Sequence, residues 1–246
     1  MLKLRKTISL GLAAGALAMA GAGIAQEVSS DPHQQMVDVF ANDSMRDRAF
    51  ESIMKSAFGS IVETDPQLAA LEMECPGFID GLSSAMRPLM KRTHNEDHIE
   101  YRKDLLALLR SELTAEEAAG AAEFFASDLG QRFFDEVFAN QNMDNVMREA
   151  MATGGEEDIS AASLNKDNNT TAIRAMMSLE PVERRAIMNK FVTEDWGKAF
   201  SKMRPKMDAL LTDPKYQQTT PEEDAEIEAV SVEFSTNHFE KCFAGQ

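Results

Sequence analysis

Apolar residues recur every three or four positions along nearly all of the chain beyond residue 30. Phe78, Leu82, Met86 and Leu89, for example, fall on one face of a helix at these spacings. No stretch alternates between apolar and polar residues with a period of two between turn signals, so the sequence predicts no sheet. We therefore expect an all-α protein, a helical bundle built from helical hairpins.

Local signals mark helix starts and expected breaks. Thr114 and Glu117 have the spacing of a capping box, which opens a helix. Pro88 is expected to kink or end the helix that contains it. The polar segment 91–97 is expected to separate this helix from the next, whose apolar face begins at Ile99.

The helical pattern breaks between residues 153 and 171. This segment contains two adjacent glycines, three consecutive acidic residues and a nearly continuous polar run, a composition typical of a linker or long loop. It separates an N-terminal helical region, 26–152, from a second region, 172–246, which ends in a C-terminal helix. One domain or two would both be consistent with this length.

The two regions contain related segments, FFASDLGQRF at 124–133 and FVTEDWGKAF at 191–200. We interpret each as the end of one helix, a tight acidic turn and the start of a second helix, in which a glycine permits close approach of the backbones. This internal repeat predicts that the two phenylalanines of each copy pack across the turn. If they did not stabilise the fold, a ligand-binding or partner-binding face would explain them better. The identical positions are Phe124 and Phe191, Asp128 and Asp195, Gly130 and Gly197, and Phe133 and Phe200.

The first copy and its flanks, LTAEEAAGAAEFFASDLGQRFFDEV at 113–137, resemble bacterial domain-of-unknown-function family 2059. The shared pattern is Leu-Thr, an acidic pair, an aromatic pair, Ser, two residues, and Gly followed by Gln or Lys. The chain departs from it at Phe125, where the family commonly has tyrosine, and at Asp128, where proline is common. The resemblance covers about residues 76–151, and the second copy matches only weakly. It implies an exported helical protein and supplies no activity or site residue.

The N-terminus has the parts of a secretory signal peptide. A basic patch at residues 3–6 precedes an apolar run at residues 8–24, and Gly23 and Ala25 supply the small residues that signal peptidase recognises. We expect residues 1–25 to be removed by cleavage after Ala25. The alternative is a membrane anchor, although the run is marginal for the roughly 20 apolar residues that a spanning helix needs. The sequence thus predicts a soluble periplasmic or secreted protein without a stable membrane anchor after cleavage.

The chain is strongly acidic. Its formal charge of −16 becomes −19 without the three basic residues of the signal peptide. Such a charge disfavours nucleic acid and anionic lipid as partners and tolerates cations or basic proteins. An alternative is that the acidic surface only keeps the protein soluble.

Cys75 and Cys242 are the only cysteines. An even number of cysteines in an exported chain favours a disulfide, which here would hold the C-terminal helix against the N-terminal half. Two unpaired thiols or a redox pair are the alternatives, although the chain has no Cys-x-x-Cys motif.

His94 and His98 are the sharpest candidates for a metal site. Their spacing places both on one helical face, where they could bind zinc together with a nearby carboxylate. Asn95 and Asp97, however, stand where the two metalloprotease patterns require glutamate. The polar surroundings favour an ordinary solvated helix face.

Methionines four residues apart form further sets on helix faces. Their thioethers could bind Cu(I) or form an adaptable apolar surface for a partner, and packing in the core is the ordinary alternative. The sets are Met86 with Met90, Met143 with Met147 and Met151, and Met203 with Met207.

These patterns favour a non-catalytic interaction or binding module of the cell envelope. The expected partner is a protein or a small apolar ligand, with no cofactor and no nucleic acid. No phosphate-binding loop or nucleophile elbow occurs in the sequence. The alternative is a metal-handling protein or metal-dependent hydrolase that uses His94 and His98 or the methionine faces.

Overall fold

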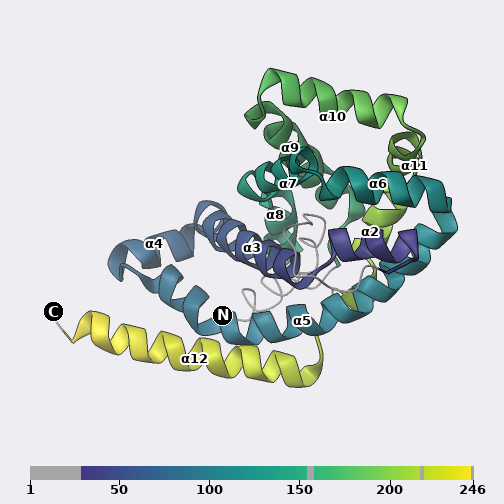
Figure 1. Cartoon of the computed structure of the whole chain (residues 1–246). Helices are drawn as coiled ribbons and strands as arrows, with labels where there is room; N and C mark the ends of the chain where they lie inside the picture. Colours follow the sequence, from purple (N-terminus) through teal and green to yellow (C-terminus); the bar gives the residue numbers. More distant parts are fainter. Residues whose placement is uncertain (1–28, 154–157, 217–218, 245–246) are drawn as a thin grey trace.

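The computed structural model describes residues 29–153, 158–216 and 219–244, and every regular element in these ranges is helical (Figure 1). This confirms the predicted all-α class. The predicted signal peptide and its cleavage site lie outside the described residues. The elements are α2 (Pro32–Phe40), α3 (Asp43–Thr64), α4 (Pro66–Glu74), α5 (Phe78–Glu112), α6 (Ala115–Ala126), α7 (Asp128–Ala139), α8 (Asp144–Thr153), α9 (Ala161–Ser178), α10 (Pro181–Thr193), α11 (Asp195–Leu211), the short 3-10 helix η1 (Pro214–Tyr216) and α12 (Pro221–Phe243).

The long helix α5 carries α12 along its outer side (Figure 1). Phe78 at the start of α5 stacks on Phe239 near the end of α12, with ring centroids 5.3 Å apart. Cys75 and Cys242 form a disulfide beside this contact, with their Cα atoms 5.8 Å apart. The predicted pairing of the two cysteines is therefore confirmed, and it joins the C-terminal helix to the start of α5.

Helix α5 continues through both positions at which a break was expected. Pro88 lies inside it, and the polar segment 91–97 is part of the same helix. Within this segment, a helix from the far end of the chain supplies partners for two polar side chains. Arg92 forms an ion pair with Glu226 of α12, and the Thr93 hydroxyl donates a hydrogen bond to the Glu223 carboxylate at 3.0 Å.

Residues 153–171 are not a continuous loop, contrary to the prediction, because α9 begins at Ala161. Two polar side chains of α9, Asp167 and Thr171, are buried and bonded to a neighbouring segment. Asp167 accepts hydrogen bonds from the backbone N–H groups of Asn145 and Val146, at 3.0 and 2.8 Å. The Thr171 hydroxyl accepts one from the backbone N–H of Asn142 at 2.9 Å. A polar sequence here marks an internal contact and not a solvated linker.

The regions on either side of this segment pack together. α9 contacts α7 and α8, and α11 contacts α5 and α6. One cluster of buried apolar side chains includes residues from both regions. The methionine sets belong largely to this core, where Met86, Met90, Met143, Met147, Met203 and Met207 are buried. In the described ranges no helix combines the length and apolarity that a membrane span requires.

Candidate functional site

Two helix corners, one in each copy of the related segments, shape the site. α6 turns into α7 at the single extended residue Ser127, and α10 turns into α11 at Glu194. The Ser127 hydroxyl caps α7 by accepting a hydrogen bond from the Gly130 N–H at 3.2 Å, and it donates one to the Phe124 carbonyl at 2.5 Å. Each corner therefore joins its two helices through one residue and brings consecutive helices into close contact.

The glycine of each corner lies where these consecutive helices approach each other. A Cβ added to Gly130 would lie 2.7 Å from the Cα atom of Phe125, and one added to Gly197 would lie 2.5 Å from the Cα atom of Phe191. Both positions exclude a side chain. In space, however, the counterpart of Phe191 is Phe125 and not Phe124, so the two corners differ by one residue in the helix before the turn.

This shift changes the aromatic contacts from those predicted. The ring pair across the first corner is Phe125 with Phe134, 5.0 Å apart, in place of the predicted Phe124 and Phe133. Phe124 instead stacks on Trp196 with ring centroids 5.0 Å apart. Across the second corner Phe191 does pack on Phe200, at 6.2 Å.

The remaining pair of the motif, Asp128 and Asp195, consists of exposed first residues of α7 and α11. They contribute to helix starts at the two corners. Neither lines the cavity described below.

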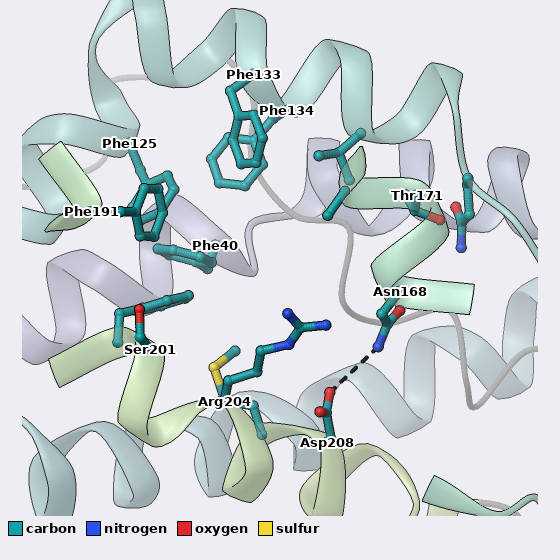
Figure 2. Close-up of a pocket in the computed structure, with 15 residues that line it drawn as sticks. Phe40, Phe125, Phe133, Phe134, Asn168, Thr171, Phe191, Ser201, Arg204 and Asp208 are labelled. Carbon is teal, nitrogen blue, oxygen red and sulfur yellow. Dashed lines mark hydrogen bonds between the residues drawn. The ribbon is translucent and has the colours of Figure 1, made fainter. Parts of the chain in front are cut away.

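A cavity of about 300 Å³ lies between α7, α9 and α11, and α2, α6 and α10 complete its wall (Figure 2). Most of the wall is apolar, and aromatic rings dominate it. Three of these rings, those of Phe133, Phe191 and Phe200, are only partly buried by the rest of the protein. The phenylalanines of the wall are Phe40, Phe125, Phe133, Phe134, Phe191 and Phe200.

The opposite side of the cavity is polar and is formed chiefly by α9 and α11. Arg204 extends its guanidinium group toward the phenylalanine side (Figure 2). It donates a hydrogen bond to the Asn169 side-chain oxygen at 2.6 Å. Asp208, one turn further along α11, is only 2% exposed and accepts a hydrogen bond from the Asn168 amide at 3.4 Å. Burial raises the pKa of the Asp208 carboxyl above its ordinary value.

Gln141, in the turn between α7 and α8, adds an unmatched polar atom to the wall. Its side-chain oxygen is buried, and the described residues provide no hydrogen-bond donor for it. Buried polar atoms in proteins nearly always have a partner, so such an atom in a cavity wall indicates a position that water or a ligand group would fill.

His94 and His98 lie outside this cavity and are buried, in contrast to the solvated face that their polar neighbours favoured. The His98 Nε2 atom lies 2.9 Å from the Ala41 carbonyl oxygen, and the His94 Nε2 atom lies 3.3 Å from that of Arg46. Burial lowers the pKa of both rings, and that of His94 falls to about 4. Their contacts hold α5 against the junction between α2 and α3. Within the residues that the structure describes, no cluster of three or more His, Cys, Asp or Glu side chains forms a metal-binding arrangement.

The sequence contained a signal for the polar side of the cavity that the prediction did not use. Phe200, the last residue of the second related segment, is followed by Arg204 and Asp208 at spacings of four, so all three share a face of α11. A charged pair in line with a core aromatic residue is unusual for a solvated face. The contribution of Phe40 had no such signal, because it reaches the cavity from a segment distant in sequence.

Comparisons of the chain with models of protein families, with curated proteins and with solved structures give no match.

Proposed function

We propose that the protein is a non-catalytic binding module that encloses a small, mainly apolar ligand in the phenylalanine-lined cavity. The observation that carries this proposal is a hollow of about 300 Å³ walled by phenyl rings. The hollow is partly open to solvent, and concave, mainly apolar pockets with a few polar groups are the usual form of small-molecule sites. A ligand would cover the ring surfaces that Phe133, Phe191 and Phe200 leave open.

The polar groups of the cavity suit recognition better than catalysis. Its lining contains one guanidinium group and one carboxyl group, together with amide and hydroxyl side chains, and it contains no histidine, cysteine, lysine or tyrosine. Histidine is the most frequent general acid or base near neutral pH. The two histidines of the metal-site alternative are already in contact with backbone carbonyl oxygens, so that alternative gains no support.

We place this binding function in the cell envelope. The basic, apolar and small-residue segments at the N-terminus support export. The disulfide fits an oxidising compartment. The resemblance of residues 113–137 to family 2059, whose members are exported helical proteins, supports the same compartment.

Trp196 offers a direct measurement of binding. It is the only tryptophan of the chain, and its ring lies 5.7 Å from that of Phe125 and 5.2 Å from that of Phe191, both of which line the cavity. Titration with 1-decanol or decanoate, as simple apolar-chain probes, should change its fluorescence in a saturable manner. Calorimetry should give the same dissociation constant.

A variant that fills the cavity tests whether these probes bind there. Ala172 lines the cavity on α9, so Ala172→Met should weaken binding of both probes by at least about tenfold while the protein remains folded. Ala162→Met makes the same change at an exposed position of the same helix and should bind as the wild type does. Absence of saturable binding in the wild type, or equal binding by both variants, would contradict the proposed function.

A further inference from the structure

We infer that the ligand is an anionic amphiphile, whose apolar part lies against the phenylalanines and whose single acidic group is bound by Arg204. This inference rests on the proposed function and specifies the head group of the ligand. It follows from the position of a guanidinium group inside a cavity that is otherwise largely apolar.

Arg204 differs from the arginines of the fold that form ion pairs. The chain has 41 acidic residues, and several arginines form ion pairs with them: Arg92 with Glu226, Arg102 with Asp38, and Arg132 with Glu183. Arg204, in contrast, has a neutral partner in the described part of the chain, the side-chain amide of Asn169. A guanidinium group has five N–H donors in a planar fork that suits a carboxylate or another oxyanion. The donors that face the cavity are therefore available to an anion from outside.

Asp208 is the one group that could oppose an anionic ligand. Its carboxyl group is directed to Asn168 (Figure 2) and accepts a hydrogen bond from the amide of that residue. Burial raises the pKa of this carboxyl group, and the nearby charge of Arg204 opposes that shift. In the described structure Asp208 is a charged neighbour of Arg204 and does not accept a hydrogen bond from its guanidinium group.

A neutral ligand would leave the cavity-facing N–H donors of Arg204 without a strong acceptor beside the phenyl rings. Hydrogen bonds from a guanidinium group to an oxyanion are stronger than those to a neutral acceptor. An acidic head group supplies such an acceptor, while the rings bind the rest of the molecule. The net negative charge of the chain opposes anions at long range, so the preference for an acid has to arise from this local contact.

Decanoate and 1-decanol form a matched pair for the test, because they share the alkyl chain and differ in charge. At pH 8 the wild type should bind decanoate roughly ten- to a hundredfold more tightly than 1-decanol, as expected for one charge-assisted contact. Arg204→Gln should abolish this preference and leave the affinity for 1-decanol unchanged. Arg204→Lys keeps the positive charge and should retain part of the preference.

Lys202→Gln serves as the matched control. It removes the same charge from an exposed position on the same helix, so its preference for decanoate should equal that of the wild type. Equal affinity of the wild type for both probes, or an unchanged preference in Arg204→Gln, would overturn the inference and leave the proposed function intact. If Arg204→Gln lost affinity for both probes equally, Arg204 would have a structural role, and the inference would also be overturned. Failure of the wild type to bind either probe would instead contradict the proposed function itself.

Discussion

At Gly130 and Gly197 the backbones of consecutive helices come too close together to admit a side chain. A Cβ at either position would lie within 2.7 Å of a backbone Cα atom of the preceding helix, a separation that real contacts do not show. The obstacle is backbone, which cannot move without displacing the helix. These two residues thus set the angle at which α7 and α11 leave their corners.

Gly130→Ala should therefore destabilise the protein by about 1–3 kcal/mol, the usual cost of overpacking. Thermal unfolding would show this as a lower Tm, by about 2–4 °C for each kcal/mol in a chain of this size. Gly59→Ala is the control, because an added Cβ there meets nothing within 4 Å and alanine is the better helix former. A Tm for Gly130→Ala as high as that for Gly59→Ala would show that the corner is not tightly packed.

The burial of His94 should make the free energy of unfolding depend on pH. Its pKa is about 4 in the folded protein and about 6.5 when unfolded, because burial disfavours the charged ring. The unfolded state therefore binds more protons between these values, and the contribution of His94 to stability decreases as the pH falls from 6.5 to 4. The slope approaches about 1.4 kcal/mol per pH unit. Asp97 acts in the opposite direction, since burial raises its folded pKa to about 6 and its protonation favours folding as the pH falls.

The effect of His94 is isolated by comparison with His94→Gln, which does not titrate. Urea unfolding at pH 7 and at pH 5 should show that the advantage of the wild type over this variant is larger at pH 7. Asp97 is present in both proteins and contributes equally to both. The same difference in unfolding free energy at the two pH values would exclude a buried, neutral His94.

At the scale of elements, the start of α8 depends on a side chain from α9. Asp167 accepts hydrogen bonds from the N–H groups of Asn145 and Val146 in the first turn of α8 and thereby provides the cap that this helix end needs. It also accepts one from the Asn145 side-chain amide at 2.7 Å. The two helices consequently stabilise each other.

Asp167→Ala should lower the free energy of unfolding by about 1–3 kcal/mol, because it leaves backbone N–H groups of α8 without an acceptor. Chemical denaturation monitored by circular dichroism would measure the loss. Asp128→Ala, which removes an exposed carboxylate from the first turn of α7, should change stability by no more than about 0.5 kcal/mol. A similar small effect for Asp167→Ala would mean that water or another group replaces the cap.

Element boundaries were predictable where the signal is local and were missed where the partner is distant. The capping box of Thr114 and Glu117 forms as predicted at the start of α6. Segment 91–97 was predicted to interrupt a helix, but its partners on α12 lie about 130 residues away in the sequence. Residues 161–171 were predicted as a linker, although their polar groups bond to the start of α8. Polar composition alone does not distinguish these contacts from contacts with water.

At the scale of the whole molecule, the disulfide and the aromatic contacts hold α12 on α5. The bridge closes a separation of 167 residues between Cys75 and Cys242. Reduction should therefore destabilise the protein by about 4–5 kcal/mol in the chain-entropy account, and proteolysis should then release α12 first. The Cys75→Ser/Cys242→Ser variant should have the lower Tm with or without reductant. Equal Tm values for the oxidised and reduced wild type would show that packing of Phe78 on Phe239 holds α12 without the bridge.

The aromatic cavity was only partly accessible from sequence. The related segments identified Phe133, Phe191 and Phe200, which do line it, and left open whether these rings serve the core or a ligand. They did not identify Arg204 or Asp208, because a motif comparison finds what two copies share. These two residues lie beyond the second segment, which ends at Phe200.

The sequence by itself determined the helical class, because the spacing of apolar residues and the capping patterns are local properties of the chain. It also determined that Cys75 and Cys242 could pair, because the chain offers no other cysteine. Only the tertiary structure decided which ring meets which, since a shift of one residue at a corner exchanges Phe124 for Phe125. It likewise decided that Arg204 faces a hollow and His94 a backbone carbonyl, because burial depends on segments that are brought together from distant parts of the chain.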